Sequence, residues 1–165
     1  MSEEGRKNKR TFVIATAIIL VFVMAPFAFG YGIYDALIHL QIGTPSLSVS
    51  SQGLTFFVTL SIPIKNPSIT PLPTLNAVVG AKLNDHVLFY AESKVVGSLD
   101  PGASCVVELT TCVDVDLPLD LAITLGEYLA GKGITYSLRM SFSVHLLTDV
   151  PGYSYEKQGV FKLYG

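Results

Sequence analysis

The chain has 165 residues, of which 50% are hydrophobic, and a formal net charge of −2 at pH 7. After the first ten residues, seven Lys or Arg stand against eleven Asp or Glu, and this mildly acidic remainder has no basic stripe, which argues against a nucleic-acid-binding surface. About 120 residues follow the apolar N-terminal segment, which is enough for one hydrophobic core and too few for two ordinary domains.

An uncharged and largely apolar segment runs from Thr11 to Tyr34 near the start of the chain. Its 24 residues would extend about 36 Å as a helix, at about 1.5 Å per residue. The hydrocarbon core of a bilayer is about 30 Å thick, so the segment is long enough to cross it. The sequence therefore predicts a transmembrane helix over residues 11–35, behind a basic tail over residues 1–10.

The distribution of charge predicts how this helix is oriented. The basic residues that precede it are Arg6, Lys7, Lys9 and Arg10, and the first basic residue after it is Lys65. By the positive-inside rule we expect a cytoplasmic N-terminus in a single-pass plasma-membrane protein, with Tyr31 and Tyr34 as aromatic anchors at the far interface. Residues 36–45 would extend the helix or form a stalk, and residues 46–165 would form the extracytoplasmic domain.

Two other interpretations of the apolar segment are open. Ala28-Phe29-Gly30 has small residues at the spacing that signal peptidases prefer, although the segment is longer than the usual apolar region of a signal peptide, about 7–15 residues. A pilin-type leader would be cut off before an apolar helix that packs in a filament core. Here Arg10 meets Thr11 directly, without the small residue that usually precedes such a cut.

The remainder of the chain has the pattern of an antiparallel β-sandwich. Apolar and polar residues alternate in short segments that are separated by Gly, Pro and Asn, as in sandwiches and barrels. The pattern predicts strands over residues 47–50, 54–64, 76–83, 87–92, 105–117, 134–147 and 153–164. Near residue 119 the period changes to that of a short helix, which ends at Gly131.

Prolines, glycines and asparagines predict where the strands end. Residues 65–73 contain three prolines and are expected to form a loop. Asn84-Asp85-His86 and Asp100-Pro101-Gly102 predict turns, and residues 97–100 are interpreted as loop. Pro63 lies within a predicted strand and indicates an edge or a bulge there, because proline cannot donate a ladder hydrogen bond.

The two cysteines are expected to remain unpaired. Cys105 and Cys112 lie seven residues apart in one predicted strand, which places them on opposite faces and about 23 Å apart at about 3.3 Å per residue. A disulfide requires Cα atoms within about 7 Å. We expect Cys105 to be buried and Cys112 to lie on the polar face.

Few residues in the sequence are candidates for catalysis or for metal binding. His39, His86 and His145 lack the spacing of a zinc site, and there is no nucleophile elbow or phosphate-binding loop. Asp114, Asp116 and Asp120 are the weak candidates for calcium, because oxygen-rich clusters bind that ion. Alternatively, the first two solubilise a strand face and Asp120 favours a helix N-terminus. No catalytic residue and no cofactor are expected.

The order of landmarks resembles a known family. A hydrophobic strand ending in Ile64-Lys65-Asn66-Pro67 is similar to the strand-then-Asn-Pro signature of the late embryogenesis abundant (LEA) group 2 family, which includes the water stress and hypersensitive response (WHy) domain. Leu99-Asp100-Pro101-Gly102 before a long strand, a helix ending at Gly131 and a last strand after a Pro-Gly loop agree with it. The resemblance covers Ser46 to Leu163.

The resemblance implies a sandwich related to fibronectin type III domains, with one helix at its side. It also implies association with desiccation and stress protection, often behind a single N-terminal span, and no established catalytic residues. We therefore expect a membrane-anchored, non-enzymatic protein with a binding or protective role at the cell envelope. The alternative is a structural subunit of a surface filament, or an accessory subunit of a membrane complex, in which the partner is protein or another copy of the chain.

Overall fold

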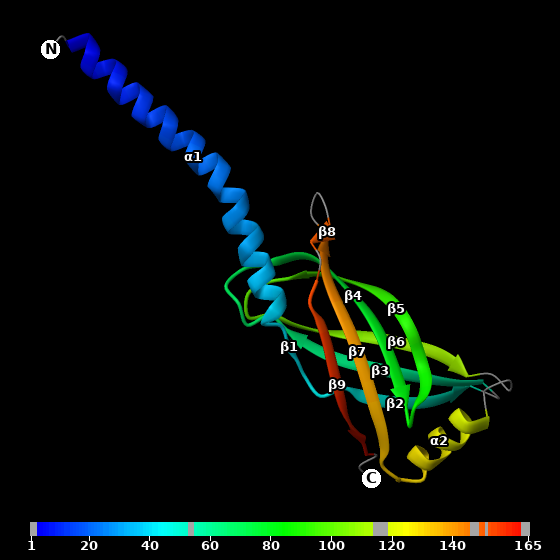
Figure 1. Cartoon of the computed structure of the whole chain (residues 1–165). Helices are drawn as coiled ribbons and strands as arrows, with labels where there is room; N and C mark the ends of the chain where they lie inside the picture. The colour runs from blue at the N-terminus through cyan, green and yellow to red at the C-terminus, as the bar shows by residue number, and fades with distance from the viewer. Residues whose placement is uncertain (1–2, 53–54, 114–118, 146–148, 151, 163–165) are drawn as a thin grey trace.

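A long N-terminal helix leads into two β-sheets that pack face to face (Figure 1). The computed structural model describes residues 3–52, 55–113, 119–145, 149–150 and 152–162. In chain order the elements are α1 (Glu3–Ile38), β1 (Gln41–Ile42), β2 (Ser46–Gln52), β3 (Thr55–Lys65), β4 (Leu72–Leu83), β5 (His86–Leu99), β6 (Ser104–Val113), α2 (Leu119–Leu129), β7 (Ile134–His145), β8 (Asp149–Val150) and β9 (Ser154–Phe161).

All strand pairs are antiparallel. In the first sheet β3 is central, with β1 and β2 along one side and β6 along the other. In the second sheet β4 lies between β5 and β7, and β8 and β9 both pair with β7. The predicted fold class, a mainly β antiparallel sandwich with one short helix behind an apolar N-terminal helix, is therefore confirmed.

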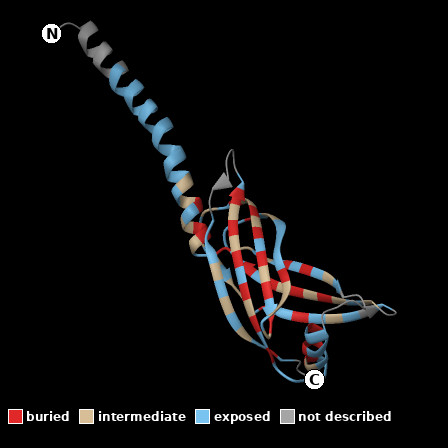
Figure 2. Cartoon of the chain, turned by 45° about the vertical axis from the view of Figure 1, so that its right-hand side comes forward, coloured by how far each residue is buried: buried red, intermediate tan, exposed pale blue. Residues whose placement is uncertain are grey.

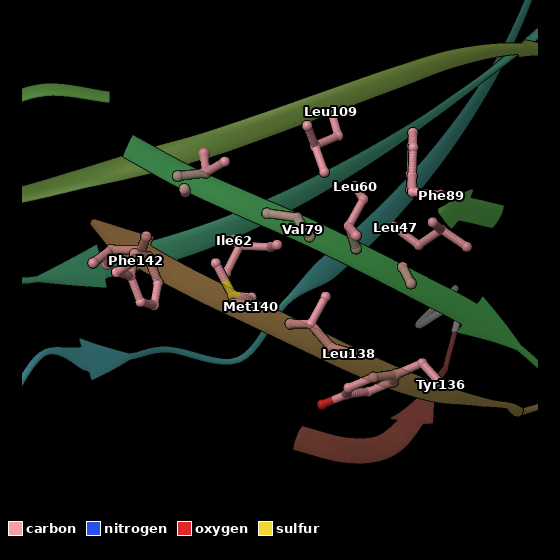
Figure 3. Close-up of a cluster of buried hydrophobic side chains, with 14 of the residues drawn as sticks. Leu47, Leu60, Ile62, Val79, Phe89, Leu109, Tyr136, Leu138, Met140 and Phe142 are labelled. Atoms are coloured by element: carbon pink, nitrogen blue, oxygen red, sulfur yellow. The ribbon is translucent and has the colours of Figure 1, made fainter. Parts of the chain in front are cut away.

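The core fills the space between the two sheets with alternate side chains from each (Figure 3). Val58, Leu60, Ile62 and Ile64 of β3 are all buried, as the alternation in the sequence predicts. They face the buried residues of the second sheet, which include Val79, Leu138, Met140 and Phe142. The alternation of apolar and polar residues predicts the core because each of these strands has one face in the core and one face in solvent.

Two predicted boundaries in the second sheet were wrong. β4 begins at Leu72, inside the segment that was expected to be loop, and β5 continues to Leu99 through residues 97–99, which were also interpreted as loop. From Tyr90 to Val95 every residue of β5 is exposed, so no apolar alternation marks this part of the strand. Several register shifts between β4 and β5 further obscure the period.

Pro63 was predicted to lie at an edge or a bulge, but its strand, β3, is the central strand of the first sheet. The proline is tolerated because the neighbouring strand is interrupted beside it. β1 ends at Ile42 and β2 begins at Ser46, and the gap leaves no partner strand that needs the missing N–H of Pro63. Its carbonyl accepts a hydrogen bond from the Gly43 N–H at 2.8 Å.

The predicted hairpin turn and helix end have the expected backbone. Asn84 and Asp85 both have positive φ, of 45° and 69°, which is the two-residue type I′ connection that matches strand twist. α2 ends at Leu129, and Gly131 two residues later has a φ of +80°. The N–H groups of Gly131 and Lys132 donate to the carbonyls of Tyr128 and Glu127, which is the Schellman pattern.

α1 has a long exposed part and a short buried end (Figure 2). Every side chain from Phe12 to Phe29 is exposed, whereas Ile33, Ala36 and Leu37 are completely buried against the sandwich. The helix from Phe12 to Ile38 is 27 residues long and contains an 18-residue window with a mean hydropathy of 2.7, so it is long and apolar enough to cross a membrane. Of residues 36–45, those up to Ile38 are helix, and Gln41 and Ile42 form β1.

Candidate functional site

The main polar feature of the sandwich is a buried asparagine beside the base of α1. Asn66 follows β3 and is 0% exposed. Its side-chain Nδ2 donates to the carbonyls of Thr70 at 2.9 Å and Leu99 at 3.0 Å, while its Oδ1 accepts from the Ser68 N–H at 3.1 Å. The side chain thus shapes its own loop and also ties that loop to the end of β5, 33 residues away in sequence.

The backbone of Asn66 forms hydrogen bonds with a second turn. Its N–H donates to the Ala103 carbonyl at 3.0 Å, and its own carbonyl accepts from the Gly102 N–H at 2.7 Å. Asp100 to Ala103 form a type II turn, in which Pro101 presets φ and Gly102 adopts a φ of +74°, as that turn requires. The four predicted structural-motif residues, Asn66, Pro67, Pro101 and Gly102, therefore meet at one place, which we call the Asn66 junction (residues 66–70 and 99–103).

The Asn66 junction also contacts α1. A Cβ added at Gly32 would lie 3.0 Å from the Thr70 Oγ1, so the loop after β3 packs closely against the helix. Ser68 stiffens this loop, since its Oγ donates to the Thr70 carbonyl at 3.0 Å and accepts from the Thr70 N–H at 3.1 Å. The consequence is that the last turns of α1, the loop and the turn after β5 form one packed unit.

The predicted membrane-interface residues lie at the two ends of α1. Arg6, Lys7, Lys9 and Arg10 belong to its first turns, where only the backbone is described. Tyr31 and Tyr34 lie at the sandwich end and are 72% and 50% exposed. Beside them Asp35 forms an ion pair with His39 at 3.3 Å when that histidine is protonated, and the His39 Nδ1 also lies 2.8 Å from the Asp35 carbonyl.

The calcium candidates are not tested by this structure. Asp114 and Asp116 fall outside the described residues, and Asp120 lies exposed in the first turn of α2. Among the residues that the structure describes, no three His, Cys, Asp or Glu side chains gather as they would around a metal ion. The Asp120 carbonyl accepts a hydrogen bond from the buried Thr124 Oγ1 at 2.9 Å.

A shallow hollow of about 500 Å³ lies on the outer face of the second sheet. Tyr90 lines it, and Gly80 allows close approach of the neighbouring strand there, because a Cβ at that position would lie 2.8 Å from the Tyr90 carbonyl oxygen. Glu156 is the carboxylate in the lining, and it is paired with Arg139, whose Nε donates to it at 2.6 Å. Glu156 is therefore neutralised by Arg139, and Lys82 is a further charged residue in the lining.

Both cysteines are free, on opposite faces of β6 as predicted. Cys112 is exposed, whereas Cys105 is half-buried rather than buried, and partial burial raises the pKa of its thiol. The Cys105 thiol is therefore less reactive than an ordinary exposed thiol, because the thiolate is the reactive form of cysteine.

Three residues that are prominent in the structure are not marked by any pattern in the sequence. The Tyr128 hydroxyl of α2 donates to the Leu47 carbonyl at 2.8 Å and thereby fastens the helix to β2. Gly32 carries the contact with Thr70, and Ile69 is 94% exposed on the same loop. A buried tyrosine, a helical glycine and a loop isoleucine have no distinguishing local pattern, so only the tertiary structure shows their partners.

No protein-family model and no curated protein matches the sequence. Solved structures resemble the fold. AT1g01470 from Arabidopsis thaliana gives a TM-score of 0.52 at 14% identity, over 75% of this chain and 80% of that one. At2g46140.1, assigned to the LEA proteins, gives 0.43 at 18% identity, over 94% and 88%. A protein from Archaeoglobus fulgidus gives 0.43 at 8% identity, over 75% and 98%.

These comparisons define a class of architecture, an antiparallel β-sandwich that this chain shares with AT1g01470. At such low identities the likeness shows the fold alone. This chain combines that sandwich with an apolar helix of the length and composition of a membrane span.

Proposed function

We propose that the chain is a single-pass, membrane-anchored and non-enzymatic β-sandwich of the LEA group 2 type, with a binding or protective role at the cell envelope. The observation that carries this proposal is the exposed apolar part of α1, which leads without a linker into the folded sandwich. Its 18 exposed residues from Phe12 to Phe29 extend about 27 Å, close to the hydrocarbon thickness of about 30 Å. A continuous exposed apolar surface of this kind indicates a contact with lipid or with protein.

The Asn66 junction supports the LEA-type assignment. The sequence landmarks Asn66-Pro67 and Asp100-Pro101-Gly102 resemble those of that family, and in this fold they bond each other. Their chemistry is structural. The two buried polar side chains among the described residues, Asn66 and Thr124, both donate to backbone carbonyls, which supports a scaffold rather than a catalytic centre.

The proposed topology places residues 1–10 in the cytoplasm and the sandwich outside it, at the plasma membrane. It rests on the four basic residues that precede the span and on Lys65 as the first basic residue after it. The native thiols allow a direct test, because Cys112 is exposed and Cys105 is not. We expect a membrane-impermeant maleimide to label intact cells that express the full chain, and Cys112→Ser to abolish most of that labelling.

Labelling that requires permeabilised cells would contradict this orientation. The state of the N-terminus separates the proposal from its alternatives. Mass spectrometry of the native protein should find Met1 or Ser2 at its start. A mature protein beginning near Thr11 would favour the filament subunit, and one beginning after Gly30 would show a cleaved signal peptide.

The protective role is tested separately from the topology. Vesicles that carry the full chain are dried and rehydrated with an entrapped dye, beside vesicles that carry an unrelated single-span protein at the same density. We expect the full chain to reduce leakage. Equal leakage, together with a stoichiometric protein partner in native-membrane crosslinks, would favour the accessory-subunit role instead.

A further inference from the structure

Ile69 is the most exposed of the large apolar side chains recorded as exposed among the described residues. It is 94% exposed, more than any of the large apolar side chains recorded as exposed from Phe12 onward in α1, where the largest value is 76% at Phe22. Its flanking residues are uncharged, and Pro67 and Pro71 are also exposed. The loop thus presents one isoleucine outward between two prolines, without a charge that would oppose burial in an apolar medium.

The contacts of the Asn66 junction determine the position of Ile69. Thr70 follows Ile69 directly and packs against Gly32, and the Thr70 carbonyl is held by the Asn66 Nδ2 at 2.9 Å. The Ile69 Cα is therefore within about 3.8 Å of the Thr70 Cα. In Figure 1 the loop between β3 and β4 lies beside the base of α1.

This position coincides with the end of the exposed apolar part of α1. Gly32 lies three residues beyond Phe29, the last residue of the continuous exposed stretch, which is about 4.5 Å along the helix axis. If Phe12 to Phe29 span the hydrocarbon core, the level of Gly32 falls in the headgroup zone, which is about 5–8 Å thick on each side. Tyr31 and Tyr34 lie at the same level and are exposed, as interfacial aromatic anchors are.

We propose that the loop after β3 is a second membrane contact, in which Ile69 inserts into the interface of the same bilayer that α1 spans. This inference rests on the proposed membrane anchoring. The loop would add a contact beside the helix, so that the sandwich is held against the bilayer at two points and its tilt relative to the membrane is restricted. The occupant is lipid because the loop is continuous, through the Gly32–Thr70 contact, with the helix surface that lipid surrounds.

The absence of tryptophan from the sequence makes a direct test available. Three single-tryptophan variants of the full chain are reconstituted into phosphatidylcholine vesicles: Ile69→Trp in the loop, Phe22→Trp in the span and Leu119→Trp in α2. Leu119 is a matched control, because it is 74% exposed and α2 lies at the opposite end of the sandwich. Brominated lipids, which quench tryptophan on contact, report depth, and circular dichroism confirms that each variant is folded.

We expect Phe22→Trp to lose fluorescence with bromines deep in the acyl chains, Ile69→Trp with bromines near the headgroups, and Leu119→Trp with neither. If Ile69→Trp behaves like Leu119→Trp while Phe22→Trp is quenched, the anchor stands and the loop contact is refuted. If Phe22→Trp is not quenched either, the membrane anchoring fails and this inference fails with it. Shielding of Ile69→Trp from acrylamide without quenching by bromine would show that protein covers the loop, which also overturns the lipid contact.

Discussion

The two ends of the sandwich are closed by different physical means. At the end that meets α1, the Asn66 junction uses a buried amide and several backbone hydrogen bonds, made by loop residues and by Leu99 at the end of β5. At the opposite end, α2 covers the core with Leu121, Leu125 and Tyr128, and one hydroxyl bond reaches β2. A polar junction has strict geometry, whereas apolar packing tolerates adjustment. The end that must hold the helix is therefore the end with directional bonds.

The largest effect is expected from the polar end. Asn66→Ala removes three hydrogen bonds and takes this partner from the Leu99 carbonyl and the Ser68 N–H, while the Thr70 carbonyl keeps its bond from the Ser68 hydroxyl. At about 1–3 kcal/mol for each buried group left unpaired, we expect a loss of about 3–5 kcal/mol in the free energy of unfolding. Urea unfolding of the full chain in detergent, followed by circular dichroism, measures it.

The control for this variant is Gln158→Ala, which removes an exposed amide from β9 and should leave the urea midpoint unchanged. Equal midpoints for Asn66→Ala and Gln158→Ala would mean that the Asn66 side chain does not stabilise the junction.

At the apolar end, Leu125→Ala truncates a leucine that is 6% exposed in α2. We expect a loss of about 2–4 kcal/mol, from lost apolar burial and the cavity left behind. Ile123→Ala is the matched control, because Ile123 lies on the same helix and is 53% exposed. If both variants unfold at the same urea concentration, α2 does not close the core in the way described.

The contact between the helix and the loop is tested by two glycines of α1. A larger side chain at Gly32 meets Thr70, whereas a Cβ at Gly30 meets nothing within 4 Å. Both substitutions to Leu gain the same helix propensity, so their difference isolates the contact. We expect Gly32→Leu to be less stable than Gly30→Leu by about 1–3 kcal/mol, because overpacking displaces the loop.

Thermal unfolding of these two variants in the same detergent gives the comparison. A Gly32→Leu protein as stable as Gly30→Leu would show that the loop yields at no cost, and that the helix is not fixed to the sandwich at this point.

The smallest effect is expected from the single hydroxyl at the far end. Tyr128→Phe removes the hydrogen bond to the Leu47 carbonyl and should cost about 0.5–1.5 kcal/mol. Tyr90→Phe is a suitable control, because Tyr90 is 87% exposed. An unchanged stability for Tyr128→Phe, measured by urea unfolding, would show that the hydroxyl does not fasten α2.

The same hydroxyl makes stability depend on pH. Burial raises the pKa of Tyr128, and burial followed by the nearby Tyr155 charge raises the pKa of Tyr136. The folded state thus favours the neutral phenols. Stability is unaffected below the unfolded pKa of about 10 and falls as the pH rises from there through the raised folded value. Urea midpoints should decline above pH 10, and less steeply in Tyr128→Phe.

Local sequence determined much of this protein. An uncharged apolar segment forms a helix with a lipid-compatible surface, alternation assigns the faces of β3 and β6, and Asn84-Asp85 and Gly131 mark a turn and a helix end, because each of these signals depends on near neighbours. β5 beyond Glu92 was missed, because a strand that leaves the core loses its alternation.

Tertiary structure alone decided how these parts meet. The sequence singled out Asn66 and the Pro101-Gly102 turn as separate landmarks, and folding joined them through bonds between residues 33 or more apart. It also buried Ile33, Ala36 and Leu37, apolar residues on either side of Asp35 that no sequence pattern distinguishes from the exposed apolar residues before them. The physical reason is the same in each case: hydrogen bonds and burial across long sequence separations depend on how the two sheets pack, which no local pattern encodes.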